Sequence, residues 1–242
     1  MVSSGIASVT LGRMDAPSTD HLVQWDRLVE STLGTDVTQL SRWATIRATV
    51  GYRPTYLLAY HGDMLVGGAL VLRRRLFGVL GVGYVSYGPL ISASAPDRTV
   101  VRAVLVDALI ELAAELSLTF VQPPEHADDV RAALLAGGFR PSVAGIAPIG
   151  SYRLDLTPEV EQIRARFSKR LKSWPNRWAS KGVAVRQGDE RDLPLLIELM
   201  TRSGTRQGFT PPSLDYVTTL YSELARGGNA ASCRTRCRSS AA

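Results

Sequence analysis

The chain has 242 residues, which is enough for one large domain or two small ones with a buried core. Hydrophobic residues make up 45% of it and charged residues 21%, as is ordinary for a globular protein. The formal net charge of +6 favours anionic partners without naming one.

Several function classes are excluded by what the sequence lacks. The two cysteines, Cys233 and Cys237, lie in the last ten residues, so no disulfide framework holds the body together, and their spacing is a poor metal signal. The three histidines have no metal or triad spacing, and no nucleophile constellation is visible. We therefore expect neither a metal nor a cofactor, and we name no catalytic residue. The start lacks a secretory signal and Leu76–Ile91 is too short and glycine-broken to span a bilayer, so we expect a cytoplasmic protein.

In chain order, residues Met1–Pro17 predict a loose start. Apolar runs separated by caps, glycines and prolines then predict a mixed set of helices and strands. They are a helix from Thr19 or Asp20, a helix over Leu40–Thr49, a hairpin of Tyr56–Tyr60 and Met64–Leu72, a strand over Val82–Tyr87, a helix over Thr99–Leu116, a strand over Thr119–Gln122, a helix over Ala127–Ala136 and a strand over Tyr152–Leu156. Hairpins beside helices predict an α/β fold with a mixed sheet.

The second part begins with a basic helix that Pro158 opens and Gly182 ends, and Pro175 should kink or split it near Trp174. The remaining elements are a strand over Val183–Arg186, a helix capped by Asp192 with Leu195, Leu196, Leu199 and Met200 facing inward, and a helix over Ser213–Arg226. After Gly228 the periodicity disappears, so we expect an unstructured tail and a domain that stops short.

The basic helix is the most informative feature. From Gln162 to Gly188 there is no Asp or Glu, and the stretch carries eight basic residues. Apolar residues at helical spacing accompany them, namely Phe167, Leu171, Trp174 and Trp178. Such a surface suits a polyanion, whether tRNA, a pyrophosphate head group or an anionic membrane. The alternative is a basic helix face that is merely solvated.

The run Arg75-x-x-Gly78-x-Leu80 has a partial likeness to the pyrophosphate loop of acyl-CoA-dependent acetyltransferases. That loop holds phosphates with backbone N–H groups at a helix N-terminus. Here the following residues read as a strand rather than a helix. We therefore favour a hairpin loop.

Short motifs along the chain together resemble a known family. In the first half they are Gln39-x-x-x-Trp43-Ala44, Gly51-Tyr52, Tyr56-Leu57-Leu58, Val66-Gly67-Gly68-Ala69, Arg73-Arg74-Arg75, Tyr87-Gly88-Pro89 and Gly137-Gly138-Phe139-Arg140-Pro141. In the second half they are Leu154-Asp155-Leu156-Thr157, the basic helix, Lys181-Gly182-Val183, Asp192-Leu193, Arg206-x-Gly208-Phe209 and Leu214-x-Tyr216. Over roughly residues 22–229, their order and spacing are similar to those of the Fem-type aminoacyltransferases of the peptidoglycan bridge.

The resemblance implies two acetyltransferase-like (GNAT) domains. Residues 1–150 would form the first, residues 151–230 the start of a truncated second, and residues 231–242 the unstructured tail. The implied activity moves an amino acid from aminoacyl-tRNA to the stem peptide of a UDP-linked or lipid-linked peptidoglycan precursor. Peripheral contact with the inner membrane surface would fit this role.

The resemblance also implies phosphate-binding residues. The family has a basic residue four positions after the tryptophan, which is Arg47 here. Basic residues in its helix match Lys169, Arg170 and Lys172, and an arginine matches Arg206. No protein nucleophile is needed, because the aminoacyl ester already carries its leaving group.

Three departures accompany the resemblance. Gln122 stands where many relatives have an acid, and an amide cannot accept a proton as a base. The run Ser173-Trp174-Pro175-Asn176 replaces a Tyr-Asn-Ile-Arg-like run, and an Arg-Pro is missing near Pro212-Ser213. Two alternatives therefore stay open. One is a non-catalytic module that binds tRNA or a pyrophosphate-bearing lipid, and the other is an acyl-CoA-dependent N-acyltransferase.

Overall fold

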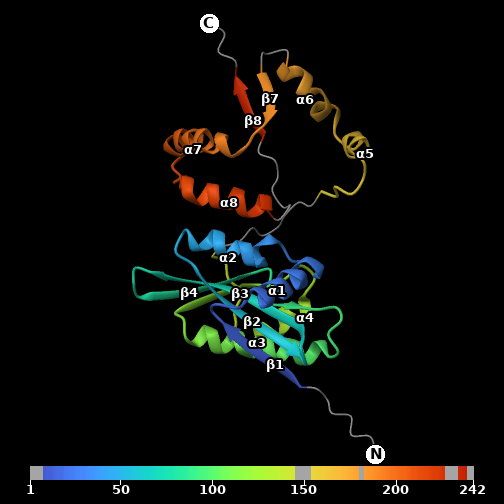
Figure 1. Cartoon of the computed structure of the whole chain (residues 1–242), viewed down its shortest axis with the longest axis vertical. Coiled ribbons are helices and arrows are strands. Elements are labelled where there is room, and N and C mark those ends of the chain that lie inside the picture. Colours follow the sequence, from blue (N-terminus) through green and yellow to red (C-terminus); the bar gives the residue numbers. More distant parts are fainter. Residues whose placement is uncertain (1–7, 145–153, 180–182, 227–233, 239–242) are drawn as a thin grey trace, which may run out of the picture. The chain divides into compact units, whose positions relative to one another are not determined.

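The computed structural model describes residues 8–144, 154–179, 183–226 and 234–238 (Figure 1). The chain forms two compact units, Met1–Ala147 and Pro148–Ala242. Among these described residues, the first unit has a sheet of six strands and the second a sheet of two.

The first unit is a mixed sheet with helices on both faces. Its strands are β1 (Val9–Met14), β2 (Arg53–His61), β3 (Met64–Leu76), β4 (Leu80–Ser86), β5 (Leu90–Ile91) and β6 (Leu118–Gln122). Its helices are α1 (Thr19–Ser31), the 3-10 helix η1 (Val37–Gln39), α2 (Ser41–Ala48), α3 (Arg98–Ala114) and α4 (Asp128–Ala136). The strand order is β1-β2-β3-β4-β6, with β5 paired to β3. All pairs are antiparallel except β4 and β6, which are parallel.

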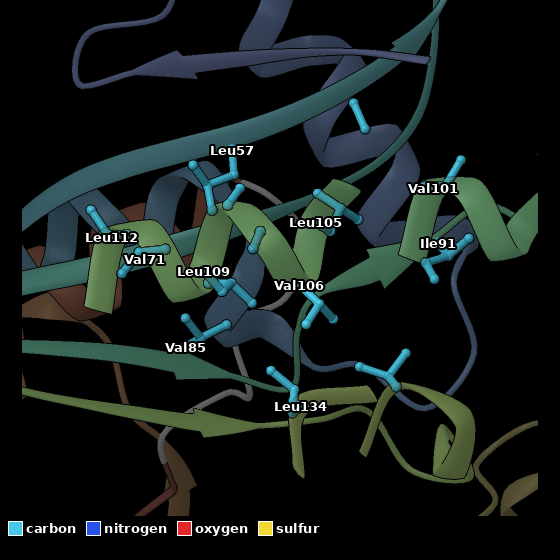
Figure 2. Close-up of a cluster of buried hydrophobic side chains, with 14 of the residues drawn as sticks. Leu57, Val71, Val85, Ile91, Val101, Leu105, Val106, Leu109, Leu112 and Leu134 are labelled. Atoms are coloured by element: carbon cyan, nitrogen blue, oxygen red, sulfur yellow. The ribbon is translucent and has the colours of Figure 1, made fainter. Parts of the chain in front are cut away.

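The two faces of this sheet bury two separate cores. Because side chains alternate along a strand, neighbours such as Leu57 and Leu58 of β2 point to opposite faces. Leu58 packs with Trp25 of α1 on one face. Leu57 packs with Leu105 and Leu109 of α3 on the other, as the close-up of that cluster shows (Figure 2). The mixed sheet between helix layers is the α/β architecture that the sequence predicts.

Most elements of the first unit are confirmed, and the hairpin expected over Arg75–Leu80 is the turn between β3 and β4. The loose start is wrong, because β1 pairs with β2 along the edge of the sheet. This strand is short and carries Gly12, and none of its residues is fully buried. An edge strand of this kind has little of the apolar alternation by which strands are recognised in a sequence.

A side chain bridges the irregular part of the sheet. The ladder along β3 is interrupted between its pairing with β4, which ends at Leu72, and its pairing with β5, which begins at Gly68. Gln39, which is fully buried, lies in this gap. Its Oε1 accepts the N–H of Leu70 at 2.9 Å, and its Nε2 donates to the carbonyl of Ser86 at 2.6 Å. The amide thus replaces the missing backbone pairing.

The second unit consists of helices and a two-stranded antiparallel sheet. Its helices are α5 (Val160–Ala165), α6 (Lys169–Ala179), the 3-10 helix η2 (Glu190–Asp192), α7 (Leu193–Gln207) and α8 (Leu214–Arg226), and its strands are β7 (Val183–Gln187) and β8 (Arg234–Arg238). The expected strand over Tyr152–Leu156 lies partly outside the described residues, and Leu154–Leu156 is not in a strand.

Of the expected kink or split at Pro175, the split is wrong, since α6 runs on to Ala179. The helix is instead divided between α5 and α6. Ser168 precedes α6 and caps its first turn, where its Oγ accepts the N–H of Leu171 at 3.3 Å. A capping serine satisfies a backbone donor that would otherwise lack a partner, which makes this position a natural helix start.

Two further expectations for the second unit need correction. Leu195 and Leu199 of α7 were expected to face inward, but 39% and 46% of their surfaces are exposed, while Leu193 and Gly204 are buried on the same helix. The tail over residues 231–242 was expected to be unstructured, but β8 pairs with β7. A strand held by backbone hydrogen bonds needs no large apolar residue, and this segment has none to signal it.

Candidate anion-binding site

The end of α2 places Arg47 against an aromatic ring. The N–H of Tyr52 bonds to the carbonyl of Arg47 at 3.1 Å, and the N–H of Gly51 to that of Ala48 at 3.0 Å. These are the two hydrogen bonds of a Schellman motif, and Gly51 supplies its left-handed residue with a φ of 83°. The motif brings the residue after the glycine back over the last helical turn. Here the contact is cationic, with Arg47 Cζ 4.3 Å from the Tyr52 ring centroid.

A second arginine reaches the same ring from β3. Arg74 Cζ lies 5.5 Å from the Tyr52 centroid. A cation over an aromatic face is stabilised by about 0.5–1 kcal/mol at an exposed site. Within the described part of the chain, neither Arg47 nor Arg74 has a carboxylate at ion-pair distance. Two guanidinium groups held by one ring and lacking an internal counter-ion form a site suited to a phosphate, to which each can donate two hydrogen bonds.

The arginine before Arg74 serves a different purpose. Arg73 Nη2 lies 2.7 Å from Asp15 Oδ1, which also accepts a hydrogen bond of 2.6 Å from Thr55. Burial alone would raise the pKa of the Asp15 carboxyl, but these hydrogen bonds outweigh it and hold the pKa below its ordinary value. The charge of Arg73 is therefore neutralised inside the protein. That of Arg74, one residue on and on the opposite face of β3, is left for a ligand.

Polar side chains gather where the parallel strands β4 and β6 end. Tyr84 donates to Ser86 Oγ at 3.3 Å and lies 3.5 Å from Gln122 Oε1. The residue that departs from the family acid is thus placed beside a phenol and a hydroxyl. None of these three side chains is a carboxylate. The group can orient a polar substrate by hydrogen bonds, but it contains no evident base for the amine proton.

The basic residues predicted on the helix lie within one turn of α6. Lys169 and Arg170 open the helix, and both are exposed. Lys172 has a structural contact, because its Nζ donates to the carbonyl of Ala165 at 2.8 Å and so caps the end of α5. The amine of Lys172 therefore helps to hold the two helices together.

Arg206 is exposed in the last turn of α7, which ends at Gly208 in a left-handed conformation. It shares the second unit with Lys169, Arg170 and Lys172 but lies on another helix, and Arg47 belongs to the first unit. The structure thus gathers the three helix residues and adds Arg74 to Arg47. In the sequence, Arg74 and Tyr52 stand out only as parts of a family pattern. The signal for their role is Gly51, whose position after a predicted helix indicates a Schellman motif.

The described residues also form a surface depression, which none of the predicted site residues lines. A depression of about 300 Å³ between α1 and the β2–β3 turn is lined by Gln24, Arg27, Leu28, Ser31, Asp63, Met64, Leu65 and Ser92. Within the described ranges, no three His, Cys, Asp or Glu side chains gather closely enough to hold a metal ion. In the same ranges, no helix has both the length and the apolarity needed to cross a bilayer.

Comparison with solved structures shows the fold. The structure of FemX superposes with a TM-score of 0.67 at 20% identity, covering 90% of this chain and 56% of that one. An aminoglycoside acetyltransferase from an uncultured soil metagenomic sample covers 61% of this chain and 97% of its own, with a TM-score of 0.42 and 14% identity. A ribosomal-protein-alanine N-acetyltransferase from Brucella melitensis biovar Abortus 2308 covers 61% of this chain and 99% of its own, with a TM-score of 0.39 and 18% identity.

The chain therefore has the fold of FemX and spans about 56% of its length. The resemblance to the Fem-type family is confirmed at the level of the fold, and the mixed sheet with helices confirms the α/β class. No family model and no curated protein sequence matches the chain.

Proposed function

We propose that this chain is part of an aminoacyltransferase that moves an amino acid from aminoacyl-tRNA to the stem peptide of a UDP-linked or lipid-linked peptidoglycan precursor. The observation that carries the proposal is the FemX fold over 90% of the chain. In the first unit, Arg47 and Arg74 around Tyr52 would bind phosphate of the acceptor. In the second, Lys169, Arg170 and Arg206 would contact phosphates of either substrate.

The reaction requires mainly that the protein positions the two substrates and supplies positive charge for their phosphates. The acceptor amine attacks the carbonyl of the aminoacyl ester, an amide bond forms as the ester bond breaks, and the ribose oxygen of the tRNA leaves as a hydroxyl with the proton that the amine loses. Holding both substrates in contact supplies much of the acceleration. Because the Tyr84, Ser86 and Gln122 group contains no evident base, we assign the amine proton to no residue of this chain.

A non-catalytic binding module is the second candidate. It is favoured by Gln122, which stands in place of the family acid and cannot act as a base. Such a module would bind tRNA or a pyrophosphate-bearing lipid without turning either over. With the aminoacyltransferase function we also propose domain limits near residues 150 and 230 and a cytoplasmic location.

An acyl-CoA-dependent reaction is disfavoured by the geometry of the first unit. The Arg75–Leu80 segment is a hairpin turn and not the start of a helix. The long helix α3 has its N-terminus capped by Asp97, whose carboxylate accepts the N–H groups of Thr99 and Val100 at 2.9 and 3.1 Å. A pyrophosphate at that helix end would have to displace a negative charge from the donors that it needs.

The phosphate site is tested by binding of a UDP-linked precursor, measured by calorimetry. Arg47→Gln and Arg74→Gln should each weaken binding about tenfold or more, because each removes a charge-assisted hydrogen bond. Arg53→Gln, an exposed arginine at the start of β2, is the matched control. Equal affinity in all four proteins would contradict the site.

The basic helix is tested by the salt dependence of tRNA binding. Each lost phosphate contact should lower the log–log salt slope by roughly 0.7 to 0.9. Lys169→Ala with Arg166→Ala should therefore flatten the slope. Lys172→Ala should chiefly loosen the contact between α5 and α6, because its amine is bound to Ala165. An unchanged slope in the first variant would leave α6 a solvated basic face.

A further inference from the structure

The turn between β3 and β4 presents apolar side chains to solvent at the tip of a long hairpin. Phe77 and Val79 have 95% and 84% of their surfaces exposed, and the adjoining Leu80 has 40%. The turn is closed by the hydrogen bond from Val79 N–H to the Leu76 carbonyl at 3.2 Å. Phe77 and Gly78 both have left-handed φ values, of 53° and 74°. A non-glycine residue in that conformation is uncommon, and here it places a large aromatic ring in water.

The neighbourhood of this tip has one sign of charge. Residues 64–96 contain no Asp or Glu and three consecutive arginines, Arg73, Arg74 and Arg75. Arg73 is paired with Asp15. Arg75 is exposed, and the described residues offer it no carboxylate at ion-pair distance. An apolar tip flanked by unpaired arginines is complementary to a bilayer with anionic headgroups, where the side chains enter the acyl boundary and the arginines remain with the phosphates.

We propose that the β3–β4 hairpin docks the first unit onto an anionic membrane, with Phe77 and Val79 inserted at the headgroup–acyl boundary and Arg75 bound to lipid phosphates. This surface is separate from the proposed chemistry and does not depend on it. Docking would nevertheless place the proposed aminoacyl transfer at the membrane surface. Arg74 precedes Phe77 by three residues, about 10 Å along a strand, so the anion site would lie near the depth of lipid headgroups.

The far end of the sheet supplies a matched control. Strands β4 and β6 run parallel from the tip, from Val82 opposite Leu118 to Ser86 opposite Gln122. Beyond that end, the Glu125 N–H bonds to the Gly34 carbonyl, which fixes the loop that carries Leu33. Leu33 is 93% exposed, as apolar as the tip residues and remote from them.

The experiment is cosedimentation of the full chain with vesicles of phosphatidylcholine alone or with phosphatidylglycerol added. The chain should bind the anionic vesicles and not the neutral ones. Phe77→Ser with Val79→Ser should weaken that binding about tenfold or more, because the two apolar side chains that would enter the membrane are lost. Leu33→Ser should bind as the unchanged chain does. Arg75→Gln should weaken binding at low salt and lose its effect at high salt.

A second measurement reports insertion directly. In Phe77→Trp, anionic vesicles should shift the emission of the added indole to shorter wavelength, and lipids brominated on the acyl chain should quench it. The same substitution at Leu33 should show neither change. Binding that is unaffected by the double variant, or an unquenched indole at position 77, would overturn the proposal. Loss of tRNA binding in the double variant, with vesicle binding intact, would assign the tip to RNA instead.

Discussion

Arg47 and Tyr52 are joined twice, by a backbone hydrogen bond of 3.1 Å and by a guanidinium lying 4.3 Å from the ring centroid. In a Schellman motif the corresponding two side chains usually make an apolar contact. A cation in that place is fixed by the helix end itself, with no carboxylate needed to hold it. The anion site is therefore formed by local structure that Gly51 makes available.

Replacing Gly51 by alanine should weaken this site. Its φ of 83° costs a residue with a Cβ about 1–2 kcal/mol, so unfolding should occur at lower urea concentration. Gly62→Ala is the control, because Gly62 has a φ of 59° in the β2–β3 turn and open space around it. Both variants should lose similar stability, and only Gly51→Ala should also lose affinity for the UDP-linked precursor. Equal affinities in the two would show that the helix end does not position Arg47.

Gln39→Ala should destabilise the first unit by roughly 2–4 kcal/mol. The change leaves the N–H of Leu70 and the carbonyl of Ser86 buried without their partner, and each unsatisfied group costs about 1–3 kcal/mol. Urea unfolding followed by circular dichroism measures the loss. Gln24→Ala, at an exposed position of α1, should change stability by less than about 0.5 kcal/mol. Similar midpoints for the two variants would mean that the sheet does not need the bridge.

The contact of Asp15 with Arg73 and Thr55 should make stability depend on acid pH. The pKa of folded Asp15 is lowered, so its contribution is present above the unfolded value of about 4 and is lost as pH falls through the folded value. Asp15→Asn should cost at most about 1 kcal/mol at pH 7 and progressively less below pH 4, since the pair is partly exposed. Asp63→Asn, in an exposed turn, should show no such trend. A constant difference between the unchanged chain and Asp15→Asn down to pH 2 would refute the assignment.

Pro175→Ala should stabilise the second unit by about 1–3 kcal/mol. Helix α6 continues through position 175, and a proline within a helix lacks one hydrogen-bond donor and crowds the carbonyl four residues before it. Helical circular dichroism and the urea midpoint should both rise. Ser173→Ala, two residues earlier, should change them far less. A fall in stability on removing Pro175 would show that the helix is broken there after all.

Regular elements of this fold could be predicted from the sequence because their signals are local. Trp25, Leu28 and Val29 recur at helical spacing and are buried on α1. The role of Gln39 could not be predicted, because its partners Leu70 and Ser86 become neighbours only when the sheet is interrupted between β4 and β5. The division of the basic helix between α5 and α6 has a local signal in Ser168, a residue type that caps helices.

The candidate site could likewise be predicted from the sequence only in part. Arg47 was found through its spacing from Trp43 in a family pattern, and the structure places it on a defined aromatic ring. Arg74 was not separated from Arg73 and Arg75 in the sequence. Strand alternation and the position of Asp15 decide which of the three is neutralised, and both require the register of β3 with its neighbours.

The most direct measurement is transfer of a labelled amino acid from aminoacyl-tRNA to UDP-linked and lipid-linked precursors by the 242-residue chain. We expect a labelled precursor, which should form at least about tenfold more slowly in Arg47→Gln and Arg74→Gln. Binding of both substrates without transfer would favour the non-catalytic module. Transfer of an acyl group from coenzyme A, with no binding of either substrate, would contradict the proposed aminoacyl transfer.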